Sequence, residues 1–396
     1  METSQQSDPL VGTVLDGRYR VETLIATGGM SGVYRGLDVR LDRPVALKVM
    51  DSRYAGDNQF LTRFQREARA VARLKDPGLV AVYDQGIDGH HPFLVMELVE
   101  GGTLRELLAE RGPMPPHAVA AVLGPVLGGL AVAHRAGLVH RDVKPENVLI
   151  SDDGDVKIAD FGLVRAIAEA KITSTSVILG TAAYLSPEQV STGDATPASD
   201  VYGVGILAYE LLTGTTPFTG DTALAVAYQR MDRDVPPPSS VIGGVPAQFD
   251  ALVRRATARD PLPRYSDAGV MGAELDAIVD DLGLPAFRVP APRNSAQHLS
   301  AQLYRRQAEE PHAPADGDAT ETIRPPAMRQ HTRAFSREYR PAAEQFAGIE
   351  MAEFHWARQR AKRVLVFWVL VVLVLTAGLA AAAWTIGTNL PGLVGP

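Results

Sequence analysis

The segment that most constrains the fold of this chain is residues 140–162, HRDVKPENVLISDDGDVKIADFG. It sets Asp142, Lys144, Asn147 and Asp160 around two short apolar runs, NVLI and VKIAD. Apolar runs bounded by Asp and Gly predict strands, and two such strands would form a hairpin. The hairpin would bring Asn147 and Asp160 together. The segment therefore predicts that an acid, a base, an amide and a second acid share one site.

These four side chains suit the transfer of a phosphoryl group from a nucleotide. That reaction needs a carboxylate near the attacking hydroxyl, a cation beside the γ-phosphate and two oxygen ligands for Mg²⁺. Asp142 can be the carboxylate and Lys144 the cation. Asn147 and Asp160 carry hard oxygen donors. Each short motif also occurs by chance, and it is the order and spacing of the whole set that favour the functional interpretation.

Composition divides the chain into regions. Residues 18–283 alternate strand and helix patterns with Gly and Pro, and they predict a folded domain after a polar N-terminus at 1–17 that lacks the features of a signal peptide. Residues 284–363 are rich in Ala, Pro, Arg, Gln and Glu. Because few large aliphatic side chains occur there, burial cannot offset chain entropy. We expect a disordered juxtamembrane linker with at most short helices.

Residues 364–385, VLVFWVLVVLVLTAGLAAAAWT, contain no charge. At about 1.5 Å per residue this run is long enough to cross the hydrocarbon core as one helix. A buried core helix is the alternative, but the run follows the linker, and no further domain is predicted to bury it. The basic cluster at 358–363 predicts that the folded domain is cytoplasmic. Residues 386–396 would form a short extracytoplasmic tail at the plasma membrane.

The folded domain begins with strand patterns and continues with helical ones. Strands are predicted within 19–38, 43–50, 79–87 and 92–99, with one helix at 58–75, and later helices at 103–112, 116–137, 197–214 and 247–260. We therefore expect a small sheet-rich lobe followed by a larger helical lobe. The net charge of −7 gives no reason to expect nucleic acid as a partner. The absence of cysteine excludes disulfides, thiolate zinc sites and cysteine nucleophiles.

A glycine-rich turn, IATGGMSGV at 25–33, lies between two predicted strands. Rossmann and Walker loops need a helix after the glycines, so both are disfavoured. A glycine hairpin can instead cover a triphosphate with its backbone N–H groups, although most such hairpins are only structural. Lys48 follows in an apolar strand, where its ammonium needs an anion such as Glu67 or a phosphate. A snorkelling surface lysine is the alternative.

Several motifs together resemble the bacterial (actinobacterial) receptor-like Ser/Thr protein kinases of the PknB-like family. They are GGMSGVY, REARAVARL, VMELVEGGTL, VHRDVKPENVLI, GTAAYLSPEQ and SDVYGVGILAYELLTG, and the resemblance covers about two thirds of the chain. It implies an α+β, bilobal protein-kinase fold with a β-rich N-lobe and an α-helical C-lobe. It also implies ATP and Mg²⁺ (or Mn²⁺) as cofactors. The linker, the single span and the short outer tail are similar to actinobacterial members.

The resemblance assigns a role to each matching position. Asp142 is implied as the catalytic base, Lys144 as the γ-phosphate contact, and Asn147 and Asp160 as metal ligands. Thr181 would bridge Asp142 and Lys144. The implied ATP-binding residues are Ile25, Ala26, Thr27, Gly28, Gly29, Met30, Ser31, Gly32, Val33, Ala46, Lys48, Glu67 (as the ion-pair partner of Lys48), the gatekeeper Met96, Glu97 and Val99 of the hinge, and Leu149.

Two further contacts and one departure follow from the same comparison. Glu188 should pair with Arg264, and Asp200 should brace the catalytic loop from the helix behind it. The first and third glycines of the family's Gly-rich loop correspond here to Ala26 and Ser31. Ala at the first place could stiffen the turn or oppose positive φ. These two replacements of glycine therefore bear on the affinity for ATP.

Substrate class and regulation also rest on the resemblance. Lys144 in the Asp-x-Lys-x-x-Asn arrangement, together with Thr181, implies Ser/Thr acceptors on protein substrates. Arg141 before the base implies control by activation-loop phosphorylation. Thr173 and Thr175 match the family's autophosphorylated threonines, with a plain solvated loop as the alternative.

The remaining partners are less constrained by the residues. Phosphothreonine readers of the FHA type could recognise Thr320 or Thr322, unless this linker stays unmodified. A back-to-back homodimer of N-lobes would allow one kinase to phosphorylate another. The sequence identifies neither the activating signal nor the physiological substrates.

Three functions compete. The first is a membrane-anchored Ser/Thr protein kinase activated by activation-loop autophosphorylation. The second is a pseudokinase scaffold that binds nucleotide or partners without turnover, which only Ala26 supports. The third, a small-molecule phosphotransferase of similar fold, is disfavoured because such enzymes lack the SPE segment and its Arg264 partner.

Overall fold

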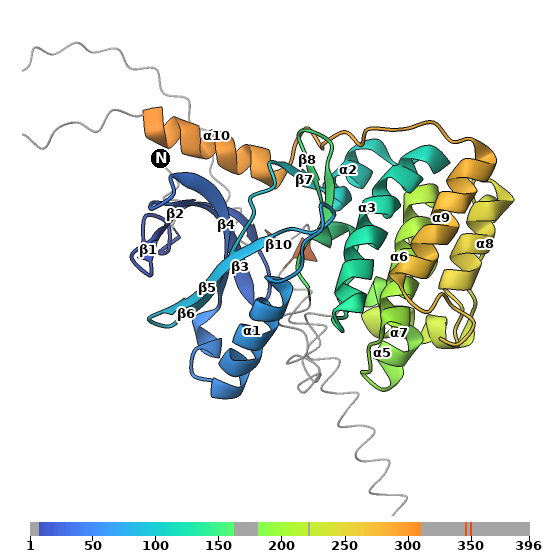
Figure 1. The fold of residues 1–396 in the computed structure, drawn as a ribbon, viewed down its shortest axis with the longest axis horizontal. Coiled ribbons are helices and arrows are strands. Elements are labelled where there is room, and N and C mark those ends of the chain that lie inside the picture. The colour runs from blue at the N-terminus through green and yellow to red at the C-terminus, as the bar shows by residue number, and fades with distance from the viewer. Residues whose placement is uncertain (1–7, 162–180, 221, 310–344, 347–348, 351–396) are drawn as a thin grey trace, which may run out of the picture. The chain divides into compact units, whose positions relative to one another are not determined.

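The computed structural model describes residues 8–161, 181–220, 222–309, 345–346 and 349–350 (Figure 1). The chain divides into two compact units, residues 1–314 and 315–396. In the second unit, β10 (Gln345–Phe346) pairs antiparallel with β11 (Ile349–Glu350). The predicted span at 364–385, the basic cluster before it and the tail after it lie outside the described residues.

The N-terminal lobe is built on an antiparallel sheet with the strand order β1-β2-β3-β4-β6-β5. Its strands are β1 (Val14–Leu15), β2 (Tyr19–Thr27), β3 (Ser31–Asp38), β4 (Arg43–Met50), β5 (Val82–Asp88) and β6 (His91–Met96). The predicted strands are confirmed, with β5 beginning three residues later than the apolar run suggested. A one-turn 3-10 helix, η1 (Ser52–Tyr54), leads from the sheet into the first helix.

Alternation along β4 explains how this sheet separates two apolar layers. Val45, Leu47 and Val49 point to one face, where they join a buried cluster with the outer strands. Ala46 and Met50 point to the opposite face and join the main core. Lys48 has the same parity as Ala46 and Met50, so the strand period places its ammonium on the core-facing side rather than on the outer surface.

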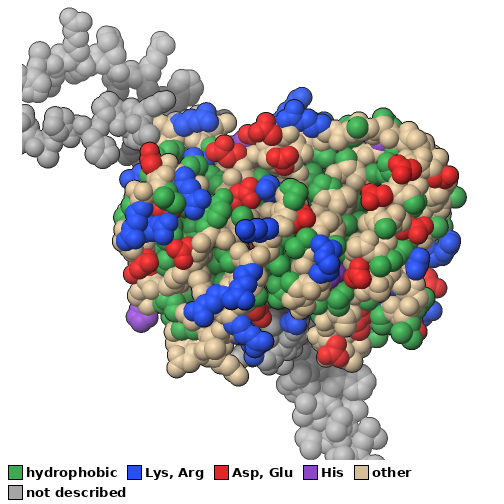
Figure 2. Space-filling view, in the orientation of Figure 1, with side chains coloured by type: hydrophobic (Ala, Val, Ile, Leu, Met, Phe, Trp, Pro, Cys, Tyr) green, Lys and Arg blue, Asp and Glu red, His purple; other side chains and the backbone are tan. Residues whose placement is uncertain are grey.

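The helix α1 (Asn58–Val71) packs on that inner face. Asp57 caps it by accepting hydrogen bonds from the backbone N–H groups of Gln59 and Phe60, at 3.0 Å each. Its apolar residues recur at helical spacing and are buried: Phe60, Phe64, Ala68 and Val71. The other face carries the exposed Arg66 and Arg69, and Arg73 is exposed just after the helix. Figure 2 shows basic side chains gathered on the surface of this lobe.

The C-terminal lobe is mainly helical. Its elements are β7 (Gly101–Thr103), α2 (Leu104–Arg111), α3 (Pro116–Arg135), η2 (Pro145–Asn147), β8 (Val148–Ser151), β9 (Val156–Ile158), η4 (Thr181–Tyr184), α5 (Pro187–Ser191), α6 (Pro197–Thr213), α7 (Ala223–Asp232), η5 (Pro238–Ser240), α8 (Ala247–Ala256) and α9 (Ala268–Leu282). Most of α6 is buried, and α3 packs against both α6 and α9. The bilobal α+β arrangement is confirmed.

By length and composition alone, α3 could cross a membrane, and it is the one such helix among the described residues. It belongs instead to the core of the C-terminal lobe. Val119, Leu123 and Leu130 are completely buried there. Its hydropathy therefore reflects burial in protein, as expected for a helix that is apolar on most sides.

The predicted linker begins too early. Residues 284–295 run as an extended segment into α10 (Ala296–Glu309), which packs against β2 and β7. The prediction failed because it counted only large aliphatic side chains. Here the buried groups include Ser295 and Ser300, whose hydroxyls are hydrogen-bonded to the sheet regions beneath them. Satisfied polar groups can be buried at little net cost.

Candidate active site

The hairpin predicted within 140–162 is present. β8 pairs antiparallel with β9, with Val148 opposite Ile158. Just beyond this pair, the Ala159 N–H donates to the Asn147 carbonyl at 2.8 Å. This hydrogen bond joins the residue before β8 to the residue after β9. Asn147 and Asp160 therefore lie at neighbouring ends of the two strands.

Asp142, Lys144 and Asn147 form one hydrogen-bonded cluster. Lys144 Nζ lies 2.8 Å from Oδ2 of Asp142. Asn147 Nδ2 donates to the Asp142 carbonyl at 2.7 Å and to Oδ2 at 3.2 Å. The Asp142 side chain is 19% exposed, so it can meet a substrate while its orientation is fixed. Since the amide nitrogen of Asn147 is directed at Asp142, its Oδ1 is left as an acceptor.

Asp200 on α6 holds the loop that carries Asp142. Its carboxylate accepts hydrogen bonds from the backbone N–H groups of His140 and Arg141, both at 2.7 Å, and lies 2.9 Å from Nε2 of His134. Asp200 is 2% exposed, where such charge-assisted bonds are strong. The predicted bracing contact is confirmed, and it holds Arg141 at a φ of 69° that side chains rarely adopt.

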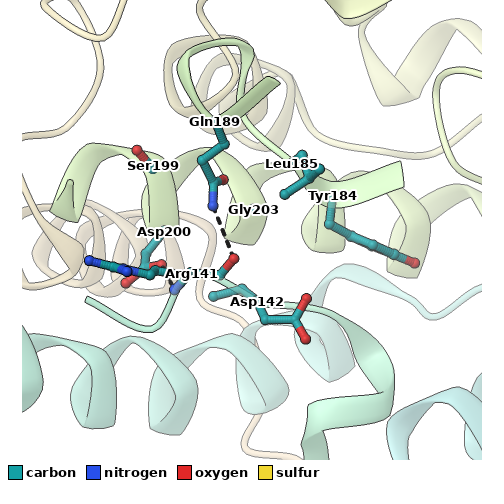
Figure 3. A pocket seen from close by; sticks show the side chains of 9 residues that line it. Arg141, Asp142, Tyr184, Leu185, Gln189, Ser199, Asp200 and Gly203 are labelled. Atoms are coloured by element: carbon teal, nitrogen blue, oxygen red, sulfur yellow. Dashed lines mark hydrogen bonds between the residues drawn. The ribbon is translucent and has the colours of Figure 1, made fainter. Parts of the chain in front are cut away.

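Figure 3 shows the same loop from nearby. The Gln189 side chain reaches from α5 and donates to the carbonyl of Arg141 at 3.0 Å. Tyr184 and Leu185 line the small pocket beside Asp142. The backbone of the loop that carries Asp142 is thus hydrogen-bonded to α6 on one side and to the SPEQ segment (186–189) on the other, so its geometry is preorganised.

Lys48 pairs with Asp160, not with Glu67. The ammonium lies 2.6 Å from Oδ1 of Asp160, which has a φ of 60°. Oε2 of Glu67 is buried and has no hydrogen-bond partner among the residues that the structure describes. Burial raises the pKa of Glu67, and the charges of Arg141, Arg63 and Arg66 only partly oppose this rise. The predicted Lys48–Glu67 pair is therefore not formed in this structure, where Asp160 takes the ammonium instead. The sequence alone does not decide between these two carboxylates.

The segment behind Asp160 is tightly held. Nε2 of His140 lies 2.8 Å from the Ala159 carbonyl, and the ring of Phe161 packs 4.7 Å from that of His140, centroid to centroid. His140 is completely buried. The strained backbone at Asp160 is thus supported on both flanks.

The predicted nucleotide loop joins β2 to β3. The Gly28 N–H donates to the Ser31 carbonyl at 2.8 Å, and the Asp51 N–H donates to the Met30 carbonyl at 3.0 Å. Positive φ does not occur at residues 25–33. Ala26 lies in strand geometry opposite Val33 with its methyl group exposed. Alanine at this place therefore imposes no backbone strain in this structure.

Apolar side chains line the gap between this loop and the hinge that joins the lobes. Ala46 faces Met96 across β4 and β6, and both belong to the main core with Val99. Leu149 on β8 is half-buried against the same core, and Val33 is half-buried on β3. Such surfaces suit the two faces of a flat aromatic base.

The hinge itself offers backbone hydrogen-bonding groups. The Glu97 carboxylate forms an ion pair with Lys157 at 2.9 Å. The backbone N–H of Glu97 donates to the Ala81 carbonyl at 2.8 Å. Within the described residues, the Glu97 carbonyl and the Val99 N–H have no hydrogen-bond partner. One free acceptor and one free donor thus stand beside the apolar gap, and a bound ligand would satisfy them.

The predicted Glu188–Arg264 pair is confirmed. Arg264 donates to both carboxylate oxygens of Glu188, at 2.7 and 2.9 Å, and its side chain is completely buried. Burial alone would raise the pKa of Glu188, but hydrogen bonds from Arg264 and Ser199 hold that pKa below its usual value. This bidentate pair anchors the SPE segment to the C-terminal lobe.

Sequence analysis missed a second ion pair near the site. Arg105 on α2 lies 2.8 Å from Glu146, 2.7 Å from Glu210 and 2.5 Å from the Tyr184 hydroxyl. The signal was present, since Glu210 is a charged residue within the apolar second half of α6. A buried charge needs a partner, and a search for one could have found Arg105.

Some predicted site residues cannot be placed. Thr173 and Thr175 lie outside the described residues, as does the side chain of Thr181. Clusters of three or more His, Asp or Glu side chains that could hold a metal are absent from the described part of the chain. Asn147 and Asp160 offer two oxygen ligands, which is the number that Mg²⁺ commonly takes from a protein when phosphates and waters supply the rest.

Comparison with known proteins agrees with this geometry. Residues 19–274 match the model of the family described as protein kinase domain. The chain is 68% identical to the serine/threonine-protein kinase PknL of Mycobacterium tuberculosis (strain H37Rv), over 98% of both chains. It is 40% identical to PrkC of Bacillus subtilis (strain 168), over 68% of this chain and 42% of that protein. The crystal structure of the M. tuberculosis PknI kinase domain superposes with a TM-score of 0.54 and 27% identity, covering 67% of this chain and 97% of that one.

Proposed function

This chain belongs to the protein kinase family, and on that premise we propose that it is a membrane-anchored serine/threonine kinase that transfers the γ-phosphate of ATP to hydroxyl groups of proteins. Kinase domains act with ATP and a divalent metal. The observation that carries the proposal is the cluster of Asp142, Lys144 and Asn147, which Asp200 holds rigidly beside Asp160.

In this proposal Asp142 orients the acceptor hydroxyl and takes its proton at a carboxylate oxygen. Lys144, 2.8 Å from that carboxylate, offsets negative charge on the transferring phosphoryl group. The fixed Asp142–Asn147 contact keeps the carboxylate in one orientation. Positioning is the main contribution of the protein to this reaction, because the nucleotide supplies a good leaving group.

The residues fit a bound metal. Oδ1 of Asn147 is an available acceptor, and Asp160 already attracts a cation, since the Lys48 ammonium lies 2.6 Å from it. Mg²⁺ (or Mn²⁺) held by these two side chains would offset charge on the nucleotide phosphates. Lys48 would then turn to the α- and β-phosphates and to Glu67.

For ATP, the loop at 25–33 would cover the phosphates, and the base would lie between Val33, Ala46 and Leu149. The Glu97 carbonyl and the Val99 N–H would bind the edge of the base, and Met96 would close the back of the gap. The strain-free backbone at Ala26 removes the one feature that favoured a pseudokinase scaffold.

Ser/Thr acceptors are supported by the position of Lys144 two residues after Asp142 and by the names of the relatives, which are serine/threonine-protein kinases. Thr181 would bridge the two. The test is phosphoamino-acid analysis of the full-length protein after incubation with labelled ATP and Mg²⁺. We expect phosphothreonine and phosphoserine, whereas phosphotyrosine alone would contradict the assignment.

Activation is proposed to follow autophosphorylation at Thr173 and Thr175. A phosphate near the catalytic loop carries almost two negative charges and would bind Arg141, whose backbone Asp200 and Gln189 already fix. The same charge would weaken the attraction of Arg141 for Glu67, which now partly offsets the effect of burial on the pKa of Glu67.

Membrane anchoring is proposed for residues 364–385, with the kinase domain in the cytoplasm because of the basic cluster at 358–363. The lipid bilayer would then be a permanent partner. We propose two further partners: FHA-type readers that recognise Thr320 or Thr322, and a second copy of the chain in a homodimer. Deleting 364–385 should move the protein from the membrane pellet to the supernatant. If carbonate extracts the full chain from membranes as readily as it extracts the deletion variant, this part of the proposal fails.

A further inference from the structure

α10 packs against β2 of the N-terminal lobe and against β7, although it follows the whole C-terminal lobe in sequence (Figure 1). The matched kinase domain ends at residue 274, well before it. Its contacts fall in two groups. One group joins its N-terminus to the strand after the hinge, and the other joins its middle to the strands that carry the glycine loop.

At the hinge end, Ser295 donates from Oγ to the carbonyl of Gly101 in β7. Oγ of Ser295 also accepts from the His298 N–H at 3.0 Å and so caps α10. The Ala296 N–H donates to Oε1 of Glu106 at 2.8 Å. The other oxygen of Glu106 accepts from the Thr103 N–H at 2.7 Å. One carboxylate therefore secures the starts of both α2 and α10.

Gly102 makes this approach possible. A Cβ atom at residue 102 would lie 2.4 Å from Cγ of Pro292 and 2.6 Å from Cβ of Ser295. Pro292 and Ser295 are both buried. The glycine is thus required by the close packing of the segment before α10 on β7, which is the kind of contact that a loose linker would not make.

At the glycine-loop end, Oγ of Ser300 lies 2.5 Å from Oγ1 of Thr23, and these residues are 2% and 5% exposed. Thr23 lies at an irregularity in the pairing of β2 with β3, where it faces Arg35. The Arg35 guanidinium lies over the ring of Tyr304, 5.5 Å from its centroid. α10 therefore contacts both strands of the hairpin, a few residues before the turn at Gly28.

We propose that α10 is a positioning element for nucleotide binding, which fixes the β2–β3 hairpin relative to the hinge through the Ser300–Thr23 and Ser295–Gly101 contacts. The hairpin and the hinge are the two surfaces between which the nucleotide would lie, so this inference rests on the proposed function. Ser300 and Ser295 touch neither nucleotide nor substrate. Undocking α10 should therefore weaken ATP binding while leaving Asp142, Lys144 and Asn147 in place.

The test compares Ser300→Glu with Leu299→Glu in the full-length protein in detergent. The two variants add the same charge to adjacent positions of one helix, but Ser300 is buried against Thr23 and Leu299 is 56% exposed. We expect Ser300→Glu to raise KM for ATP at least about fivefold, with kcat and KM for a protein substrate within about twofold of the unmodified chain. Leu299→Glu should change none of these constants.

Hydrogen exchange gives a readout that does not depend on catalysis. Ser300→Glu should speed amide exchange in residues 19–38 and 101–103, and Leu299→Glu should not. If the unmodified chain transfers no phosphate, the proposed function fails, while the exchange data still test the docking. Equal KM for ATP and equal exchange in the two variants would overturn the proposal.

A milder pair of variants guards against misfolding of Ser300→Glu. Ser300→Ala leaves the Thr23 hydroxyl buried without a partner, whereas Thr23→Val combined with Ser300→Ala removes both hydroxyls. Replacing both partners with apolar groups is often nearly neutral. We expect KM for ATP to rise about two- to threefold in the single variant and to return toward the starting value in the double variant. No rise in the single variant would contradict the proposal.

Discussion

Lys48 and Asp160 form an ion pair of 2.6 Å across the gap between the two lobes. The ammonium thereby satisfies the carboxylate that is proposed to bind metal. Glu67 on α1 is left with a buried oxygen that has no hydrogen-bond partner within the described part of the chain. Two carboxylates thus compete for one cation. A nucleotide with its metal would shift this balance, because the metal would replace the ammonium at Asp160 and free Lys48 for the phosphates and Glu67.

Glu67→Gln tests this competition. Since burial raises the pKa of Glu67, the charged form destabilises the nucleotide-free state, and an amide of the same shape should raise Tm by about 2 °C. In the nucleotide-bound state Lys48 would lose its partner, so kcat/KM should fall at least about tenfold. Thermal unfolding without nucleotide and steady-state kinetics measure the two effects. Glu274→Gln, at an exposed position, is the matched control.

The two effects of Glu67→Gln have opposite signs, which makes the outcome specific. A variant that is less stable and fully active would show that Glu67 is a structural residue of α1. Loss of stability together with loss of activity would indicate general damage.

The Glu188–Arg264 pair predicts a pH-dependent stability. Its hydrogen bonds hold the folded-state pKa of Glu188 below the usual value of 4.5, so the pair contributes fully above about pH 4.5. That contribution is lost as the pH falls through the lower, folded-state pKa. At pH 7, Glu188→Gln should cost about 3–5 kcal/mol, because the buried Arg264 guanidinium loses its charged partner and keeps hydrogen bonds to backbone carbonyls alone.

The difference in Tm between the unmodified chain and Glu188→Gln should therefore shrink as the pH is lowered from 6 toward about 3. Asp153→Asn, where the side chain is 92% exposed, should give a small difference that does not vary. If the difference in Tm between the unmodified chain and Glu188→Gln stays constant over this pH range, the assigned direction of the Glu188 pKa shift is contradicted.

Replacing Thr173 and Thr175 together with Ala should lower kinase activity at least about tenfold, because no phosphate would then bind Arg141 and order the loop. The companion variant Ser174→Ala with Ser176→Ala changes the same segment equally and should keep its activity. Phosphopeptide mapping by mass spectrometry identifies the modified positions. Full activity in the threonine variant would refute this mode of activation.

Much of the site follows from local sequence. Short-range pattern predicts the β8–β9 hairpin, because apolar alternation and turn residues fix its register over only a few positions. The family motifs correctly predict the contacts of Asp200 and of the Glu188–Arg264 pair. In each case the motif identifies the charged residue and its partner by position in the sequence, and the interaction between them is strong.

Two features needed the three-dimensional structure. The sequence offers two carboxylates, Glu67 and Asp160, as partners for Lys48, and the structure shows that the ammonium lies 2.6 Å from Asp160. The docking of α10 depends on hydroxyl groups at Ser295 and Ser300, which composition counts as polar and therefore as exposed. In both places the deciding contacts join polar groups more than a hundred positions apart in the sequence, so no local periodicity marks them.

The most direct test of the account is phosphate transfer from [γ-³²P]ATP by the full-length protein and by its Asp142→Asn variant, with a protein substrate and Mg²⁺. The variant keeps the size and most hydrogen bonds of Asp142 but cannot accept a proton from the acceptor hydroxyl. We predict a rate about 10²–10⁴ times lower at unchanged nucleotide affinity. Equal rates for the two proteins, or no transfer by the unmodified chain, would contradict the claim that this cluster is the active site of a protein kinase.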